Sequence, residues 1–408
     1  MVFMSIISLV VLFAMNMVRK KGDLLYPATI QTGIWLFVLI VYALNRGSFN
    51  YVDPSVFLII QLSCMFFSIG CLLASGGAKR KIPIVLSEKY LISLDRVTTL
   101  LVLLSIIALF FVSKRAEEIV HGSDVVSAYF NLRNAINYGD PGDGYGILRY
   151  LFTLTYFAAS CVMLNYIYRG NNRSKFKILA IIMICMVMVF LSTSRTQLLA
   201  FLLLLGMPLY YYGRIKLVSF VTALMLVFLP IFSVLGILLG KFSFDPDTMG
   251  ETFSSYFVAP MVAFSGLLDT PINLSLGSHT FRFFLSLMHT LGIGEPPLPL
   301  IQSFSYVPIP TNLYTSFQPY YLDFGLIGII GIQLILGLVH GIFYRLISVG
   351  EVTIVRVFLF IISLLPLFSI YSTETHFLQL SLWIQYAIFG LLFLIILPRL
   401  RICVGKTL

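Results

Sequence analysis

Long apolar runs constrain this chain more than any other feature of its sequence. Runs of about 20 predominantly apolar residues recur along it, and each can cross a hydrocarbon core of about 30 Å as one α-helix. Hydrophobic residues make up 59% of the chain and charged residues only 11%, whereas about a quarter of the residues of a soluble domain are charged. The sequence therefore predicts an all-α polytopic membrane protein.

The apolar runs predict eleven membrane helices and three regions. We expect the helices at about residues 2–18, 25–44, 55–75, 97–113, 147–168, 178–192, 197–212, 217–240, 324–346, 353–371 and 377–397. The regions are 1–240, with eight helices and an external loop at 114–146; 241–323, a long external segment that we call the lid; and 324–408, with three helices and a tail.

Basic residues predict the orientation of the helices. If the loop that holds Arg19, Lys20 and Lys21 is cytoplasmic, alternate loops collect 19 of the 27 basic residues on that side, which is the bias that orients membrane proteins. The N-terminus is then outside and the C-terminus inside. The basic cluster follows the first apolar run, the reverse of a cleavable signal peptide, so we expect this run to remain as a helix.

The same inventory excludes several kinds of function. The net charge of +10 is divided between two sides of a membrane, so it does not indicate nucleic acid as a partner. Four of the five cysteines lie in apolar runs and the fifth in the basic tail, so we expect free thiols and no metal cluster. The chain has no phosphate loop, nucleophile elbow, zinc signature or dinucleotide fingerprint, and we predict no cofactor.

Arg195 is a candidate anion-binding residue. It stands in a tight hairpin between two apolar runs of about 15 residues, which as helices rise about 22 Å and fall short of the hydrocarbon thickness. We therefore expect the hairpin to be recessed, where an arginine requires an anion or an internal partner. Guanidinium binds phosphate through paired donors. The alternative is a snorkelling arginine that caps two helix ends.

The lid carries a second candidate cation. It holds nine of the 17 prolines, many aromatic residues and the arginine Arg282, with His289 seven residues later. At helical spacing these two residues share one face. A second cation near Arg195 would allow the protein to hold a diphosphate without a metal. The alternative is an amphipathic helix that lies on the membrane with its arginine toward the headgroups.

The end of the lid combines tyrosines, an amide and a carboxylate. We assign sugar binding to Tyr314, Tyr320 and Tyr321, because tyrosines can stack on sugar rings and hydrogen-bond to them, and to Asn312 in the same part of the lid. Asp323 precedes an apolar run and should lie at a helix N-terminus, where exposed amides favour a carboxylate. It is a candidate general base, and the alternative is a helix N-cap.

A second candidate for proton transfer is His376, which follows Glu374 in a short external hairpin. A histidine beside a carboxylate has the chemistry needed to take a proton from a hydroxyl group. The alternative is a solvated hairpin histidine without a role in chemistry.

Three stretches of this sequence resemble the Wzy-type oligosaccharide repeat-unit polymerases, also called O-antigen polymerases. They are Pro310-Thr311-Asn312-Leu313-Tyr314-Thr315, Tyr320-Tyr321-Leu322-Asp323-Phe324-Gly325 and Ser194-Arg195-Thr196. The resemblance covers the whole chain in topology. A family pattern of an arginine and, eleven positions later, a glycine is also matched by Arg133 and Gly144, but not by Arg282.

The resemblance implies a metal-independent enzyme of the membrane-embedded (GT-C-type) glycosyltransferase group in the bacterial inner membrane. Its donor would be a glycan on undecaprenyl diphosphate and its acceptor a second carrier with one repeat unit, joined at the periplasmic face with inversion. Arg195, Arg282, Arg133 and His289 would hold the diphosphate, and His376, Asp323 or Glu374 would handle the proton. Membrane lipids and a chain-length regulator protein are the implied partners.

Two other functions fit part of the pattern. A glycan ligase shares the chemistry and differs only in its acceptor. A flippase or transporter would show repeated halves, broken helices and ionisable groups at mid-membrane, whereas here the charged residues lie at the ends of the predicted helices and the lid is one-sided.

Overall fold

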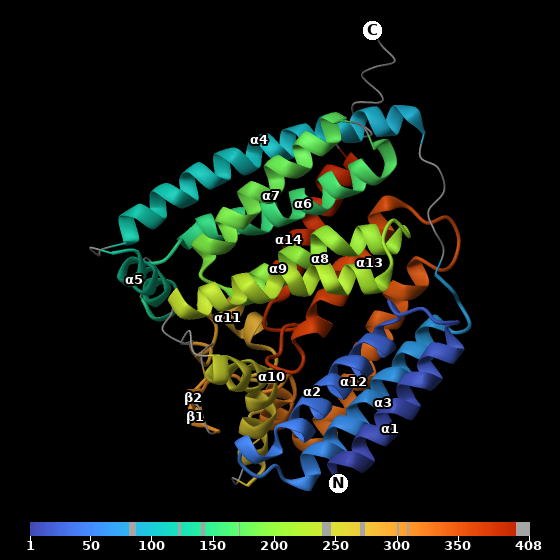
Figure 1. Ribbon diagram of the computed structural model, residues 1–408, viewed down its shortest axis with the longest axis vertical. Coiled ribbons are helices and arrows are strands. Elements are labelled where there is room, and N and C mark those ends of the chain that lie inside the picture. Colours follow the sequence, from blue (N-terminus) through green and yellow to red (C-terminus); the bar gives the residue numbers. More distant parts are fainter. Residues whose placement is uncertain are drawn as a thin grey trace. The chain divides into compact units, whose positions relative to one another are not determined.

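The computed structural model describes residues 1–80, 87–120, 124–139, 143–170, 172–238, 246–269, 274–299, 302–307 and 310–396. Most of these residues are helical (Figure 1). The predicted basic tail, with Cys403, lies outside the described residues. The other four cysteines are buried free thiols.

Eight of the described helices are long and apolar enough to cross a membrane. They are α1 (Val2–Arg19), α2 (Pro27–Leu44), α3 (Pro54–Ser75), α4 (Glu88–Ile119), α6 (Arg149–Arg169, preceded by the 3-10 turn η2, Gly146–Leu148), α7 (Asn172–Ser192), α9 (Leu217–Leu238) and α12 (Phe317–Leu346). The predicted class, an all-α polytopic membrane protein, is confirmed.

The other three predicted membrane helices are shorter. They correspond to α8 (Arg195–Tyr211), to α13 (Ile354–Leu364) with the 3-10 segment η3 (Leu365–Ser369), and to α14 (Leu380–Phe389) with the π-helical segment η4 (Gly390–Ile396). A 3-10 segment has i to i+3 hydrogen bonds and a π segment has i to i+5 hydrogen bonds, in place of the i to i+4 bonds of an α-helix. The last two of these runs therefore change helix type along their length.

The lid contains more helix than the sequence suggested. It holds α10 (Pro246–Leu268), α11 (Arg282–Thr290) and a two-stranded antiparallel ribbon of β1 (Ser305–Tyr306) and β2 (Pro310–Thr311). Pro246 is the first residue of α10, a position that needs no amide hydrogen, and Pro260 lies inside the helix. The predicted helices did not include α10, although its stretch Phe253–Leu268 is apolar.

The described chain divides into two compact units. Unit 1 comprises Met1–Lys81, Pro246–Val352 and Ser363–Trp383, and unit 2 comprises Ile82–Asp245, Thr353–Ile362 and Ile384–Leu408. The cavity and the polar network described below belong to unit 1. Both candidate arginines of the first half of the chain, Arg133 and Arg195, belong to unit 2.

In unit 1, α3 and α12 lie side by side in close backbone contact (Figure 1). Glycines allow this approach: a Cβ atom at Gly337 would overlap the Phe67 carbonyl oxygen, and one at Gly341 would lie 2.7 Å from the Cys71 carbonyl oxygen. Such small-xxx-small spacing lets membrane helices pack by their main chains. The pair therefore forms a fixed frame for the residues that α12 carries.

A kink at Gly325 divides α12 into two segments. Gly325 has φ 64° and ψ −156°, a conformation that glycine adopts without steric cost and other residues do not. The segment before the kink carries Tyr320 and Asp323, and the segment after it carries Gln333 and His340. The kink thus allows polar residues from both segments to approach the same loop.

In unit 2, α6 packs against α4, α7 and α8 around a buried ionic cluster. Lys177 Nζ lies 2.7 Å from Asp95 Oδ1, and both side chains are less than a tenth exposed. Asn165 Nδ2 donates to the same carboxylate at 3.0 Å, and Arg169 Nη1 lies 3.5 Å from its other oxygen. A buried charge is tolerated when it is paired and hydrogen-bonded in this way.

Candidate active site

A cavity of about 150 Å³ in unit 1 brings together many of the residues that the sequence singled out. Its walls come from the lid, the beginning of α12 and the segment that precedes α14. The lining residues are His279, Arg282, Leu298, Pro299, Gln302, Asn312, Leu313, Tyr314, Gln318, Pro319, Thr373, Glu374 and Leu378. One guanidinium, one carboxylate, three carboxamides, an imidazole and a phenol thus share one small space, a set suited to phosphate and sugar groups.

Arg282 supplies the positive charge of this cavity. It is the first residue of α11, and its Nε donates to the Leu298 carbonyl oxygen at 2.6 Å. Within the described residues it forms no ion pair with a carboxylate. Burial lowers the pKa of the Arg282 guanidinium from its ordinary value, because desolvation disfavours the charged form. An anionic ligand beside Arg282 would again stabilise the charged form of its guanidinium group.

Glu374 supplies the negative charge, on a side chain that is almost completely buried. Its carboxylate accepts backbone N–H groups from His376 at 2.6 Å, Phe377 at 3.1 Å and Leu378 at 2.9 Å. The Tyr320 hydroxyl donates to Glu374 Oε1 at 2.9 Å. Glu374 therefore fixes the turn around itself as well as lining the cavity.

Asp323 does not cap a helix. The first segment of α12 begins six residues before Asp323, at Phe317, with Ser316 as its N-cap residue, and Asp323 lies two residues before the Gly325 kink, near the start of the second segment. The buried carboxylate accepts instead from the backbone N–H groups of His279 at 3.1 Å and Thr280 at 2.6 Å. The predicted helix at 324–346 corresponds to the segment of α12 after the Gly325 kink, and the segment before the kink was not predicted. Asp323 thus clamps the turn that leads into Arg282.

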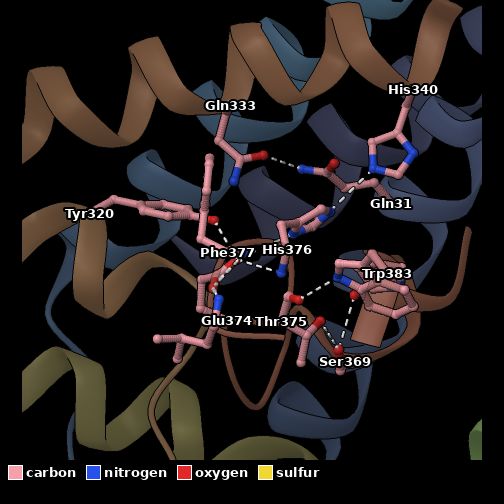
Figure 2. A network of polar contacts seen from close by, with 12 residues as sticks. Gln31, Tyr320, Gln333, His340, Ser369, Glu374, Thr375, His376, Phe377 and Trp383 are labelled. Atoms are coloured by element: carbon pink, nitrogen blue, oxygen red, sulfur yellow. Dashed lines mark hydrogen bonds and ion pairs between the residues drawn. The ribbon is translucent and has the colours of Figure 1, made fainter. Parts of the chain in front are cut away.

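His376 lies behind Glu374 and is largely shielded from solvent, with 11% of its side chain exposed. Its Nδ1 lies 3.5 Å from Glu374 Oε1, and its Nε2 lies 3.1 Å from Nε2 of His340 on α12. Figure 2 shows the segment that carries it lying against the part of α12 that holds His340. The alternative of a solvated histidine does not describe this packed loop.

Several side chains hold this loop in place. Trp383 Nε1 donates to the Thr375 carbonyl oxygen at 2.9 Å, and the hydroxyls of Ser369 and Thr375 lie 2.8 Å apart (Figure 2). The backbone N–H of Ser316, just before α12, donates to the Ile370 carbonyl oxygen at 2.9 Å. These contacts make the loop a fixed support for Glu374 and His376.

Sequence reasoning missed three polar residues of this network. Gln31 on α2 donates to Gln333 on α12 at 2.8 Å, and both are buried, as is His340 (Figure 2). All three lie inside long apolar helices. A polar or ionisable residue within a membrane helix is a signal of function in itself, and it could have drawn attention to them.

The remaining predicted residues of unit 1, Tyr320, Tyr321 and His289, do not line the cavity. Tyr320 is fully buried and Tyr321 packs with its ring centroid 5.8 Å from that of Phe264; neither lines the cavity. His289 is exposed on α11 and lies 3.3 Å from the Gly294 carbonyl oxygen.

In unit 2, Arg133 contacts the hairpin between α7 and α8, and Arg195 is the first residue of α8. Arg133 Nη1 donates to the Thr193 carbonyl oxygen at 2.8 Å, two residues before Arg195. The Arg195 guanidinium carbon lies 4.5 Å from the centroid of the Phe232 ring, a cation–π contact.

The donor groups of the cavity suit sugars and phosphates. They are mainly carboxamides, hydroxyls and one guanidinium, and a guanidinium repels a cation while it attracts an anion. Among the residues that the structure describes, no three histidine, cysteine or acidic side chains gather closely enough to hold a metal ion.

Comparison with known proteins gives one informative match. No family model matches the chain, and no solved structure matches it. A protein of Escherichia coli (strain K12) named "Putative O-antigen polymerase" is 24% identical over 389 residues, which cover 93% of this chain and 94% of that protein. The similarity therefore spans both units, the lid included, and it confirms the predicted resemblance to the Wzy-type O-antigen polymerases.

Proposed function

We propose that this chain polymerises lipid-linked oligosaccharide repeat units, as in O-antigen biosynthesis, at the periplasmic face of the inner membrane. One observation carries the proposal: Arg282, a partly desolvated cation, faces the same cavity as Asn312, Tyr314 and Glu374. That combination suits a ligand that is part phosphate and part sugar. The relative from Escherichia coli, with its printed name, supports the same activity.

The reaction would be a single displacement at the donor sugar. A hydroxyl oxygen of the acceptor glycan attacks the anomeric carbon of the donor glycan, while the bond from that carbon to the undecaprenyl diphosphate oxygen breaks. The bonding pair leaves with the diphosphate, and the hydroxyl proton passes to a base. Attack opposite the leaving group inverts the anomeric configuration.

Arg282 would neutralise the charge that develops on the leaving diphosphate. Electrostatic stabilisation of this kind is a large share of enzyme catalysis when the donor is already in position. Nε of Arg282 donates to the Leu298 carbonyl oxygen. This bond fixes the guanidinium group and leaves its two other nitrogens available to a ligand. A guanidinium in this role supplies the charge that a metal ion supplies in other transferases, so the proposed mechanism is metal-independent.

Glu374 and His376 would take the hydroxyl proton together. Glu374 lines the cavity, and His376 Nδ1 lies 3.5 Å behind its carboxylate. A proton accepted at the carboxylate can therefore pass to the imidazole, which His340 contacts from the far side. Asn312, Tyr314 and Gln318 would hold the two sugars in line.

Deleting the gene in its host tests the activity. Surface polysaccharide separated on a gel should show a lipid core that carries a single repeat unit. Loss of all repeats with accumulation of lipid-linked polymer would indicate a ligase, and repeat units trapped in the cytoplasm would indicate a flippase. Either result would overturn the proposal.

Arg282→Ala tests the site, with His289→Ala as the matched control on the same helix. Both side chains lie on α11, but only Arg282 lines the cavity. In the deletion strain, Arg282→Ala should give no polymer and His289→Ala normal polymer, at equal amounts of membrane-inserted protein measured by immunoblot. Polymer of normal length from Arg282→Ala would remove Arg282 from the site.

A further inference from the structure

The lid helix α11 has an apolar side that the described chain leaves largely exposed. Phe284, Leu287, Met288 and, just after the helix, Leu291 are spaced three, one and three residues apart, so they form one row along the helix. Their exposed fractions are 47%, 52%, 44% and 69%. The lid is predicted to lie outside the hydrocarbon core, and there a row of exposed apolar side chains indicates a surface that meets a lipid bilayer or another molecule.

The polar residues of α11 lie on its other side. At 100° per residue, Arg282, Ser286 and His289 fall on the face opposite the apolar row. Arg282 and Ser286 are partly buried, and Arg282 lines the cavity. The helix is therefore amphipathic, with its arginine turned away from its apolar row. The two alternatives for this helix, an arginine in a binding site and a helix that lies on the membrane, are thus compatible.

The start of α11 is attached to α12 at the point where α12 enters the hydrocarbon. Residues 324–344 include no Asp, Glu, Lys or Arg, so the membrane-crossing part of α12 begins near Phe324. The Asp323 carboxylate accepts the backbone N–H of Thr280 at 2.6 Å, and the ring centroid of Phe281 lies 6.2 Å from that of Phe324. Because α11 begins at the next residue, its first turn lies at the depth of the membrane boundary.

We infer that α11 lies in the plane of the membrane, with its apolar row among the acyl chains of the leaflet on the lid's side. The helix has nine residues and a length of about 13 Å, whereas a hydrocarbon core is about 30 Å thick. It is therefore too short to cross the bilayer and long enough to lie on it. Amphipathic helices bury one face at a membrane surface in this way.

The neighbouring surface of α12 favours lipid over another protein as the occupant. Ile327, one turn into the membrane-crossing part of α12, is 85% exposed, so α12 presents apolar side chains to the bilayer close to the point where α11 is attached. The apolar row of α11 adjoins this lipid-facing surface. The inference goes beyond the proposed function and does not rest on it, because it concerns only where the lid lies.

Nitroxide spin labels test this inference in the full-length protein, held in nanodiscs of phosphatidylethanolamine and phosphatidylglycerol. The four described native cysteines are buried, so the labels would be attached to single added cysteines in a Cys403→Ser background. The positions are Leu287→Cys and Leu291→Cys in the apolar row, and His289→Cys as the matched control on the other side of the same helix. The unmodified background measures any labelling of the buried thiols.

Power saturation then compares the collisions of each label with oxygen, which concentrates in hydrocarbon, and with a water-soluble nickel chelate. The ratio of oxygen to nickel collisions should be severalfold higher at Leu287→Cys and Leu291→Cys than at His289→Cys. A label at Phe284→Cys should give the same ratio as one at Leu291→Cys, because a helix in the membrane plane holds both of its ends at one depth.

A second variant tests whether the apolar row holds the helix in the bilayer. Leu287→Asp places a carboxylate among the acyl chains, which is costly, and should lower the ratio measured by a label at Leu291→Cys severalfold. His289→Asp adds the same charge on the other side of α11 and should leave that ratio unchanged. Both positions are exposed, so neither change disturbs a packed core.

Three outcomes would overturn the inference. The first is an equal ratio at Leu287→Cys and His289→Cys, which would place the apolar row in water and leave it for a partner protein. The second is an equal effect of Leu287→Asp and His289→Asp on the label at Leu291→Cys. The third is spin–spin broadening that disappears when labelled and unlabelled protein are mixed, which would identify a second copy of the chain as the occupant. The proposed function fails by a different measurement, normal polysaccharide in the deletion strain, so the two failures are distinguishable.

Discussion

Replacing Asp323 with asparagine should loosen the turn that positions Arg282. The Asp323 side chain is fully buried, and its two oxygens accept the backbone N–H groups of His279 and Thr280. Asparagine has nearly the same shape, but it offers one oxygen and one NH2 group. One backbone N–H would therefore keep a neutral acceptor and the other would face a donor.

The magnitude follows from these two contacts. A hydrogen bond to a charged group contributes about 1.5–3 kcal/mol and a neutral one about 1 kcal/mol, while a buried donor without an acceptor costs about 1–3 kcal/mol. Weakening one bond and orphaning the other should cost about 3 kcal/mol locally. That change raises the opening equilibrium of the turn about 100-fold.

Hydrogen exchange followed by mass spectrometry measures this opening. Peptides that contain His279 and Thr280 should exchange about 100-fold faster in Asp323→Asn, and polymer length should fall because Arg282 is no longer held beside the cavity. Unchanged exchange with complete loss of polymer would refute the reasoning, since it would assign Asp323 to proton transfer instead of to the clamp.

Two further predictions concern packing and acid sensitivity. Gly341→Ala should destabilise the protein by about 1–3 kcal/mol through overpacking, because the new Cβ would lie 2.7 Å from the Cys71 carbonyl oxygen. Gly331→Ala on the same helix is the control, because a Cβ there would have open space. Only Gly341→Ala should lower the thermal unfolding midpoint in detergent, and equal midpoints for the two variants would contradict the close approach of α3 and α12. Asp124, the N-cap of α5 (Val125–Tyr138), accepts hydrogen bonds from the Ser127 hydroxyl and from the backbone N–H groups of Val126 and Ser127, and these bonds lower its pKa. Its folded pKa lies below its unfolded pKa, so its stabilisation is complete above the unfolded value, about 4, and is lost as the pH falls through the folded value. Amide exchange in α5, corrected for the intrinsic pH dependence, should accelerate on acidification in the wild type and not in Asp124→Asn, and an equal response in both would contradict the cap.

The helices could be predicted from the sequence because lipid-facing surface requires long apolar runs, and these are local. The lengths of the helices were less predictable. The apolar run at 97–113 corresponds to only part of α4, which begins seven residues before Asp95. A charged residue interrupts the apolar run, but the helix continues past Asp95 because its carboxylate is paired with Lys177 inside unit 2. The helix α10 was not predicted because its apolar stretch, Phe253–Leu268, is shorter than the run of about 20 residues that indicates a membrane helix.

The site was predictable in part. Arg282, Asn312, Tyr314 and Glu374 are polar residues in a proline-rich segment or beside a helix end, and the structure places all four around one cavity. His340 was overlooked although an ionisable residue inside a long apolar helix is itself a signal of function. Its contact with His376 depends on how the loop after η3 returns to α12, which no local pattern encodes.

The glycine contacts between α3 and α12 have a consequence for specificity. Main-chain atoms lie close together there, so a shift of one helix along the other would bring these atoms into overlap, and His340 keeps its position relative to α3. The cavity wall, by contrast, is built largely from lid side chains such as Leu298, Asn312 and Tyr314. Exchanging those side chains could adapt the protein to different sugars while the helix pair beneath them keeps its geometry.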